Sequence, residues 1–222
     1  MNYLKVSCMD FRRSQITRSI AYLASMNKIL RDVSGIFLLK GWKQKDQENI
    51  VLIDENMIPE ILRIQSEAFR NKHEAEIIRY SKRFRKTFYV IKNQKKVVGY
   101  CIHYLKPIIS SKGFKKQSVI FSIATDRNFR GKGFGKKLLK ESIEEMKLNR
   151  VSSILLYVNA NNIPAIRLYE KTGFVITDKI ENICGHKEKC YKMELKLTLF
   201  ISCIMLQKAL FSIHDDLIIS VT

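Results

Sequence analysis

Three glycines at alternate positions, Gly131, Gly133 and Gly135, stand among basic residues and could bind a phosphate group. Glycine lets the backbone approach an anion without interference from a side chain. The glycines follow an apolar segment, residues 118–125, and precede a segment with helical periodicity. A helix that begins here directs its first N–H groups and the positive end of its dipole at one point, which favours a pyrophosphate. The basic residues that add charge are Arg130, Lys132, Lys136 and Lys137.

Two other phosphate-binding motifs do not fit these glycines. A P-loop needs a Lys-Ser or Lys-Thr pair after its last glycine, whereas Gly135 is followed by Lys136 and Lys137. A dinucleotide-binding fold needs G-x-G-x-x-G spacing and an acidic residue after the next strand, and no acidic residue directly follows Val158. Taken alone, the glycines could also do no more than cap an ordinary helix.

The elements that must position this turn are a mixture of strands and helices. Apolar residues at three- and four-residue steps predict helices at Met57–Phe69, from the glycines to Met146, and at about residues 163–172, which Gly173 ends as a left-handed cap. Helices and hairpins together predict an α/β fold with a mixed sheet. The predicted strands are Asn49–Ile53, Phe88–Lys92, Lys96–Leu105, Ser118–Thr125, Ser153–Val158, Phe174–Asp178 and Cys190–Leu197.

Composition bounds the classes of protein to which the chain can belong. Its 222 residues are 46% apolar with three prolines, which suits one compact domain plus extensions and excludes a disordered or fibrous chain. The net charge of +19 attracts phosphates, so candidate partners are a phosphorylated cofactor, nucleic acid, the ribosome or an acidic peptide. No zinc-finger, helix-turn-helix or ribonucleoprotein motif is present, so a direct nucleic-acid function is not expected.

At this point the chain resembles the GNAT superfamily of N-acetyltransferases. Arg130-x-x-Gly133-x-Gly135 matches that family's pyrophosphate motif, (Gln/Arg)-x-x-Gly-x-(Gly/Ala), and a second family motif extends over Leu156–Phe174. The resemblance covers about residues 49–197 and is closest in motif to the ribosomal-protein alanine N-acetyltransferases. It implies a GNAT-type fold: a mixed, mostly antiparallel sheet with one splayed parallel strand pair and flanking helices.

The resemblance also implies the chemistry. Acetyl-CoA is the expected co-substrate, and a primary amine attacks its thioester directly, without an acyl-enzyme or a metal. Tyr169 is implied as the general acid for the leaving thiolate, which is feasible in a dry site because a phenol has a pKa near 10 and a thiol near 8.5. Asn162 would hold the cofactor through its amide, and a backbone N–H near Ile123 would stabilise the oxyanion.

The implied cofactor site combines one strand with the glycine turn. Backbone groups of Ile123, Ala124 and Thr125 would pair with the pantetheine arm like an added strand. The cofactor would lie between this strand and the strand at residues 153–158, where the two splay apart. The residues implied to bind the pyrophosphate are Arg130, Gly131, Lys132, Gly133, Phe134, Gly135 and Lys136.

The general base and the acceptor remain open. The related alanine N-acetyltransferases have a glutamate base where this chain has Tyr157, and tyrosine is a poor base at neutral pH. Glu170, His103 or a backbone carbonyl could act through water instead. A protein N-terminus, such as that of a ribosomal protein, is the first expected acceptor, and a polyamine, amino sugar or amino acid is the second. A non-catalytic acyl-CoA-binding module is the other alternative, against which the presence of Tyr169 argues.

The two ends and the cysteines complete the predictions. Residues 1–48 are predicted to be a basic extension of unknown role, and residues 198–222 an apolar tail. The uncharged run Leu197–Leu206 is ten residues long, which is too short for a membrane span of about 20. Five irregularly spaced cysteines are typical of a reducing cytoplasm, where we expect the protein. Cys184, His186 and Cys190 do not complete a zinc site, so no metal is expected.

Overall fold

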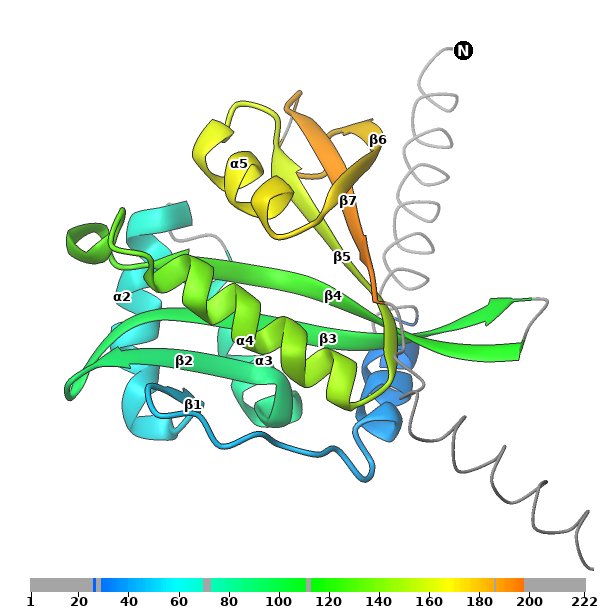
Figure 1. Ribbon diagram of the computed structural model, residues 1–222, viewed down its shortest axis with the longest axis horizontal. Helices are drawn as coiled ribbons and strands as arrows, with labels where there is room; N and C mark the ends of the chain where they lie inside the picture. Colours follow the sequence, from blue (N-terminus) through cyan, green and yellow to red (C-terminus); the bar gives the residue numbers. More distant parts are fainter. Residues whose placement is uncertain (1–25, 27–28, 70–72, 111–112, 186, 198–222) are drawn as a thin grey trace, which may run out of the picture.

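One seven-stranded sheet forms the centre of the protein (Figure 1). The computed structural model describes residue 26 and residues 29–69, 73–110, 113–185 and 187–197. The strands are β1 (Ile50–Leu52), β2 (Phe88–Asn93), β3 (Lys96–Ser110), β4 (Gly113–Thr125), β5 (Val151–Asn159), β6 (Val175–Glu181) and β7 (Lys189–Lys196). Their order is β1-β2-β3-β4-β5-β7-β6, and every neighbouring pair is antiparallel except the parallel pair β4 and β5. The predicted mixed α/β fold is confirmed.

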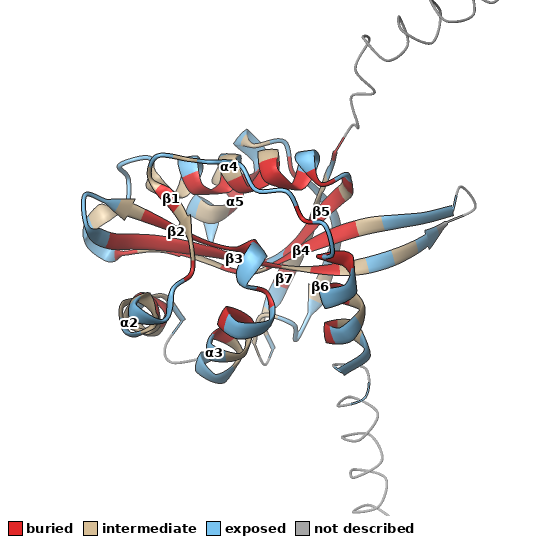
Figure 2. Cartoon of the chain, turned by 90° about the horizontal axis from the view of Figure 1, so that it is seen from below, coloured by how far each residue is buried: buried red, intermediate tan, exposed pale blue. Residues whose placement is uncertain are grey.

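Helices cover both faces of the sheet (Figure 2). On one face lie α4 (Phe134–Leu148) and α5 (Ile163–Lys171), and on the other lie α2 (Ile58–Phe69) and α3 (Glu74–Arg83). Helix α4 packs on β2, β3, β4 and β5, whereas α2 packs on β3 and β4. The core of the domain therefore lies on both sides of the central strands. Three 3-10 turns connect the elements: η1 (Glu55–Met57), η2 (Arg85–Thr87) and η3 (Arg127–Phe129).

Strands β4 and β5 pair only over part of their length. The parallel register joins Lys116–Val119 of β4 to Val151–Leu155 of β5 and stops there. Beyond it, residue 120 and residues 122–125 of β4 pair with β3 alone among the described strands. A bulge accompanies the separation, because Phe121 is skipped in the register between β3 and β4. An extra residue bends its strand and increases the local twist, so β4 diverges from β5 at this point.

The helix next to the glycine turn buries the face that its sequence predicts. Leu138, Leu139, Ser142, Ile143 and Met146 of α4 are all buried. Its carboxyl end is tied to the N-terminal segment, where the side-chain amide of Asn149 exchanges two hydrogen bonds of 2.7 Å with the backbone of Lys43. The start of α4, and with it the glycine turn, is thus held on the sheet by packing along the whole helix.

Helix α3 is absent from the helices that the sequence predicts, and it is a correction to that prediction. It buries only Ile77, Tyr80 and Ser81, so its apolar face is too short to show a clear period. Acidic residues in its first turn and basic residues in its last turn complement the helix dipole. The Tyr80 ring meets the bulged Phe121 edge to face at 4.6 Å, so α3 supports β4 where that strand diverges.

The described part of residues 1–48 packs against the sheet domain. Residues 29–38 form a helix in which the Asp32 side chain is 1% exposed. Asp32 forms ion pairs with Arg79 at 3.3 Å and Arg83 at 2.9 Å, both on α3. A buried carboxylate is costly without such partners, so this helix belongs with α3.

Trp42, which follows this helix in the chain, makes a second contact, with Glu145 of α4 on the opposite face of the sheet. The Trp42 indole N–H donates to Oε1 of Glu145 at 2.8 Å, and the Tyr89 hydroxyl donates to the same oxygen at 2.7 Å. The compact part of the described chain therefore begins before residue 49, where the sequence places the boundary. The sequence does not reveal this contact, because a buried acid and a single tryptophan have no periodicity.

The predictions for the two ends of the chain concern residues that the structure describes only in part. Residues 1–25 and the predicted apolar tail, residues 198–222, lie outside the described residues. Within the described residues, no helix combines the length and apolar character that crossing a membrane requires.

Candidate active site

A pocket of about 610 Å³ lies where β4 and β5 diverge. Its walls come from α2, β4, β5, α5 and the loop between β6 and β7. Ile123, Asn162 and Tyr169, three of the residues predicted from the sequence, line it together. Tyr157 lines it as well. The divergence of the two strands thus brings one residue of β4 together with residues of α5, although about 40 positions separate them in the chain.

The glycine turn stands beyond the end of β4, at the start of α4. Gly131 and Gly133 have φ angles of 75° and 83°, in the left-handed region that favours glycine, and Gly133 is the N-cap of α4. In the first backbone hydrogen bond of the helix, the Lys137 N–H donates to the Gly133 carbonyl at 3.0 Å. The N–H groups of residues 134–136 therefore have no acceptor inside the helix and can bind an anion.

Charge and close packing complete the turn. Arg130, Lys132 and Lys136 are exposed around it. The Arg130 Nε donates to the Thr125 carbonyl at 3.2 Å, which ties the turn to the end of β4. A Cβ on Gly135 would lie 3.2 Å from Oγ1 of Thr125, so the helix approaches the strand closely there. Positive charge, open N–H groups and left-handed glycines are what a pyrophosphate requires.

An ion pair anchors the same turn from the other face of the sheet. Asp126 caps η3 by accepting from the Asn128 N–H at 2.8 Å, and it pairs with Arg63 of α2. Burial by itself would raise the pKa of Asp126, but the Asn128 N–H and the Arg63 guanidinium together lower this pKa below its usual value. Asp126 is therefore ionised at neutral pH and fixes the entry to the glycine turn.

Tyr169 places a neutral phenol in the pocket. Its side chain is buried, with 7% exposure, and its ring lies 5.8 Å from that of Phe174. Burial, with a smaller contribution from Cys101, raises the pKa of Tyr169 well above its usual value. The phenol thus remains protonated over the whole neutral range and can act only as a proton donor there.

Asn162 has a structural task in addition to its predicted one. It is the N-cap of α5, where its Oδ1 accepts from the Ala165 N–H at 3.3 Å. The side-chain NH₂ group remains as a donor toward the pocket that Asn162 lines.

These features match a known family. The sequence model of the Acetyltransferase (GNAT) family matches residues 56–174, more than half of the chain. The chain belongs to the GNAT family. The resemblance in its two motifs is therefore confirmed.

Relatives of this GNAT chain include enzymes that act on proteins. It is 40% identical over 58 residues to the [Ribosomal protein bS18]-alanine N-acetyltransferase of Salmonella typhimurium. That segment is 26% of this chain and 39% of the relative. The crystal structure of Ribosomal-protein-alanine N-acetyltransferase from Brucella melitensis is 26% identical with a TM-score of 0.55, covering 67% of this chain and 99% of that one.

A third comparison concerns the fold alone. The crystal structure of the NatC complex bound to Gag peptide and CoA is 21% identical, with a TM-score of 0.60. The similarity covers 68% of this chain and 100% of that chain. The architecture of the GNAT chain is thus that of a structure solved with CoA and a peptide.

Two residues considered as general base, His103 and Glu170, do not line the pocket of the GNAT chain. His103 lies outside the pocket: it is fully buried, with Nδ1 2.8 Å from Oγ of Ser118 and Nε2 3.2 Å from Sγ of Cys101. Burial lowers the pKa of His103 to about 3, so it is a neutral structural histidine. Glu170 is exposed on α5 and does not line the pocket. Neither side chain therefore lines the pocket, and action through water, as the sequence suggests, stays a prediction.

A polar group at the pocket wall was not predicted from the sequence. The Tyr100 hydroxyl donates to Oε1 of Gln65 and lies 3.0 Å from Oγ of Ser122, which itself donates to Gln65 at 3.2 Å. Gln65 and Ser122 line the pocket. The only signal for this group was the polar Gln65 on the apolar face of the predicted helix, a mismatch that is typical of a functional or buried polar site.

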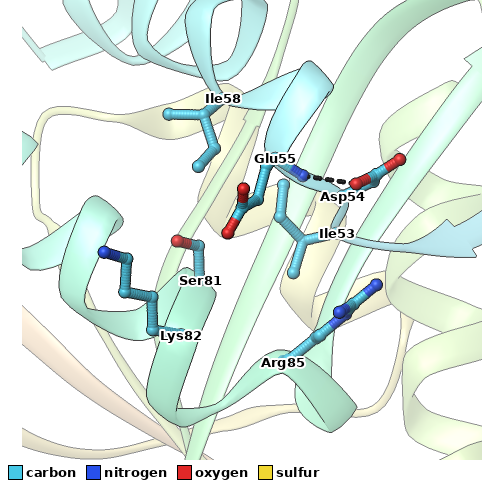
Figure 3. Close-up of a pocket in the computed structure, with 7 residues that line it drawn as sticks. All are labelled: Ile53, Asp54, Glu55, Ile58, Ser81, Lys82 and Arg85. Carbon is cyan, nitrogen blue, oxygen red and sulfur yellow. Dashed lines mark hydrogen bonds between the residues drawn. The ribbon is translucent and has the colours of Figure 1, made fainter.

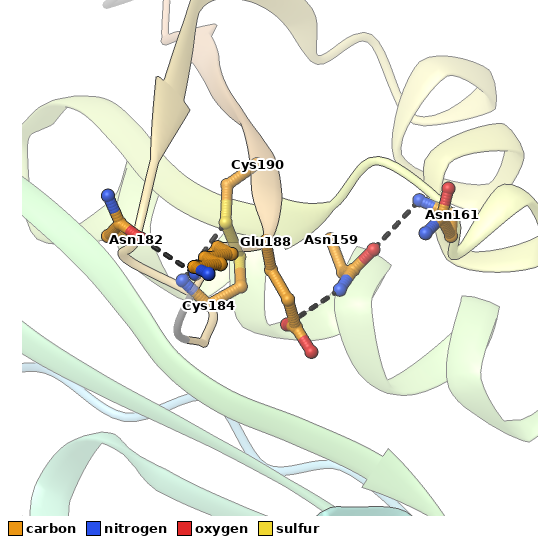
Figure 4. The surroundings of a disulfide bond; sticks show 7 residues. Asn159, Asn161, Asn182, Cys184, Glu188 and Cys190 are labelled. Atoms are coloured by element: carbon orange, nitrogen blue, oxygen red, sulfur yellow. Dashed lines mark hydrogen bonds between the residues drawn. A yellow bond between two sulfur atoms is a disulfide. The ribbon is translucent and has the colours of Figure 1, made fainter.

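The loop between β6 and β7 brings a carboxylate and a disulfide to the pocket. Glu188 and Cys184 both line it, and Cys184 is disulfide-bonded to Cys190 with a Cα–Cα distance of 6.1 Å (Figure 4). The cysteine pattern did not predict this bridge, because two cysteines six positions apart resemble a chance spacing. The cytoplasmic localisation that this pattern favours stays a prediction. No group of three or more metal-ligating side chains occurs among the described residues.

A smaller pocket of about 220 Å³ lies away from this site (Figure 3). It is formed around η1, with Glu55, Ser81, Lys82 and Arg85 among its lining residues. It contains none of the residues predicted from the sequence. The chemistry of the GNAT chain is therefore assigned to the larger pocket.

Proposed function

We propose that this chain transfers the acetyl group of acetyl-CoA to a primary amine, and that the amine is the N-terminus of a protein. One observation supports this above all others. The unpaired edge of β4 leads from the glycine turn of α4 to the buried phenol of Tyr169, which lines the pocket together with Ile123. A phosphate site, an extended backbone edge and a proton donor are thus arranged in the order in which coenzyme A carries its pyrophosphate, its pantetheine arm and its thioester.

The binding step uses mainly backbone groups of this chain. The N–H groups of residues 134–136 bind the pyrophosphate, with Arg130, Lys132 and Lys136 around it. Residues 123–125 of β4 pair with the pantetheine arm, since no described strand occupies their β5 side. A backbone N–H near Ile123 stabilises the charge that develops on the thioester oxygen.

Tyr169 supplies the proton that the leaving thiolate needs. Its raised pKa keeps the phenol neutral until the thiolate forms beside it. Proton donation from a phenol to a thiolate is uphill in pKa, so it is helped by the burial of the Tyr169 side chain. No cysteine of the described residues is free to act as a nucleophile at this pocket: Cys184 is disulfide-bonded, and Cys101 is buried outside the pocket.

The choice of a protein N-terminus rests on the acceptor side. The pocket is large enough for the first side chains of a peptide beside the thioester. The relatives from Salmonella and Brucella are named for acetylation of an alanine of a ribosomal protein. The charge of +19 opposes a free polyamine and favours an acidic peptide or the surface of the ribosome.

Turnover of acetyl-CoA, followed as free thiol, tests both parts of this proposal. The panel contains peptides that begin with Ala, Ser and Met, each with a free or a blocked N-terminus, and spermine and glucosamine as small amines. We expect thiol release only with free N-termini, and mass spectrometry places the acetyl group on the α-nitrogen. Thiol release with the small amines alone would reject a protein acceptor, and no release with any amine would reject acetyl transfer.

A further inference from the structure

The loop between β6 and β7 holds Glu188 against the pocket in a fixed position (Figure 4). Its ends are joined by the Cys184–Cys190 disulfide. Inside the loop, the Glu188 N–H donates to the Gly185 carbonyl at 3.1 Å, and the Glu188 carbonyl accepts from the Asn182 N–H at 3.0 Å. Both backbone groups of Glu188 are therefore fixed by the loop itself.

Asn159 orients the Glu188 carboxylate. The Asn159 Oδ1 accepts from the Asn161 N–H at 2.8 Å, so its NH₂ group must be the side that faces Glu188. This NH₂ group donates to Oε2 of Glu188 at 2.8 Å (Figure 4). Since an NH₂ group can only donate, Oε2 of Glu188 is the acceptor in this bond. Among the described residues, Asn159 is the one side chain that bonds to this carboxylate, which leaves Oε1 for a ligand.

Gly185 makes room for the carboxylate. A Cβ on Gly185 would lie 2.6 Å from Cδ and 2.7 Å from Oε2 of Glu188. Any other residue at position 185 would therefore displace the acid from Asn159. The loop thus combines a glycine, an amide partner and a disulfide around one half-buried carboxylate at the pocket wall.

We propose that Glu188 is the general base that takes the proton of the acceptor amine, an inference that rests on the proposed acetyl transfer. Glu188 and Tyr169 line the same pocket but come from different elements, the β6–β7 loop and α5. Tyr157, which stands where related enzymes have a glutamate, is a phenol and cannot accept a proton at neutral pH in its neutral form. Glu188 supplies the carboxylate that β5 lacks.

The protons balance in this scheme. Glu188 takes one proton from the acceptor ammonium, directly or through one water, and the neutral nitrogen attacks the thioester carbonyl. A C–N bond forms, the C–S bond breaks, and Tyr169 gives its proton to the thiolate. The second proton on nitrogen passes to the Tyr169 phenolate, and Glu188 releases its proton to water. One ammonium and one thioester yield one amide, one thiol and one proton.

The groups near Glu188 define what a pH profile can report. The other titratable side chains that line the pocket are His73, Tyr104, Tyr157 and Tyr169. Lys187 and Lys189 flank Glu188 in the chain, and both are exposed. Of these groups His73 is the one that could also act as a base, so it needs its own variant in the experiment.

The pH dependence of kcat/KM for an acceptor peptide, with saturating acetyl-CoA, tests Glu188→Gln. At pH 7 we expect a loss of about 100-fold, the size of a missing general base. The variant can use only amine that is already neutral, so its rate should rise about tenfold per pH unit until the α-amine titrates near pH 8. The loss should then shrink to less than about tenfold at pH 9.5. Glu181→Gln, an exposed acid at the end of β6, is the matched control and should keep the wild-type profile.

Two further variants separate the possible explanations. Gly185→Ala keeps the carboxylate but displaces it, so we expect a loss of about tenfold at pH 7 with unchanged CoA binding. His73→Gln should keep the wild-type profile. A loss in Glu188→Gln that is equal at every pH, full activity of Gly185→Ala, or the predicted profile in His73→Gln would each overturn the assignment. If the wild type releases no thiol with any amine, the proposed function and this inference both fail, whereas wild-type turnover with an unchanged Glu188→Gln rejects only the inference.

Discussion

The cofactor side and the acceptor side of the pocket are built in different ways. In the proposed function the cofactor side, formed by β4, the glycine turn and α4, binds with backbone groups whose positions follow from glycines at fixed spacing. The proposed acceptor side takes single side chains from α2, β5 and the β6–β7 loop. Backbone recognition of a constant ligand leaves a motif in the sequence, whereas recognition of a variable acceptor leaves almost none.

The largest effect should come from Tyr169, where the two sides meet. Replacing Tyr169 by Phe removes the proton donor but keeps the ring contact with Phe174. We expect kcat to fall about 100- to 1,000-fold, with little change in the affinity for CoA measured by calorimetry. Tyr191→Phe, on β7 and outside the pocket, is the matched control and should keep its turnover. An unchanged kcat in Tyr169→Phe would remove this residue from its role.

The raised pKa of Tyr169 also predicts the shape of the alkaline limb. Because burial keeps the phenol protonated, wild-type turnover should not decline through ionisation of this group between pH 8 and 10. A decline in this range that is present in the wild type and in Tyr191→Phe but absent in Tyr169→Phe would show that the phenol titrates lower than its burial implies.

The affinity for CoA should depend on the glycines of the turn. The double variant Gly133→Val and Gly135→Val places a β-branched residue at a φ of 83° and a second side chain against Thr125. We expect the affinity for CoA to fall about 50-fold or more, because the N–H groups of α4 can no longer approach the pyrophosphate. Gly41→Val has a similar strain at a φ of 70° but lies in open space, so it should bind CoA normally. Equal affinity in the double variant and the control would contradict the proposed phosphate site.

The two sides also differ in what the sequence predicts of them. The strand at Ser153–Val158 is observed as β5 (Val151–Asn159), and the helix after the glycines buries the predicted residues. These elements have long apolar patterns, and local pattern determines them. By contrast, α3 buries a short face and is not predicted from the sequence, although its Tyr80 supports the bulge of β4.

The buried or oriented acids that the sequence did not reveal share one cause: their positions depend on contacts between residues distant in the chain. Glu188 acquires its position from Asn159, 29 residues away, and Glu145 its burial from Trp42, 103 residues away. Neither contact leaves a periodic signal in a single sequence. His103 is a different case: its position on a strand near the cleft suggests a base, but in the structure its ring contacts Ser118 and Cys101.

His103 should therefore influence stability instead of catalysis. Its pKa of about 3 in the folded state is far below the 6.5 of the unfolded chain, so below pH 6.5 the unfolded chain binds a proton that the folded chain cannot bind. The free energy of unfolding should therefore decrease as the pH is lowered. This group contributes a decrease of about 2 kcal/mol between pH 6.5 and 5. Urea unfolding at pH 7.5 and 5 should show a smaller difference for His103→Gln than for the wild type. The exposed His73→Gln should retain the wild-type difference.

The smallest effect should come from the disulfide, and it tests whether the acceptor side needs its covalent link. Cys184→Ser breaks the bond but keeps the Cys184 N–H that donates to Sγ of Cys190 at 3.0 Å. The flanking pairing of Glu181 with Lys189 still closes the hairpin, so Glu188 should become more mobile without leaving the pocket. We expect kcat/KM for the peptide to fall about threefold, with unchanged affinity for CoA. A reductant should lower the wild type to the same level and leave Cys184→Ser unaffected, with acetylated peptide measured by mass spectrometry because the reductant interferes with detection of free thiol. A change in CoA affinity instead would mean that the two sides of the pocket are not independent.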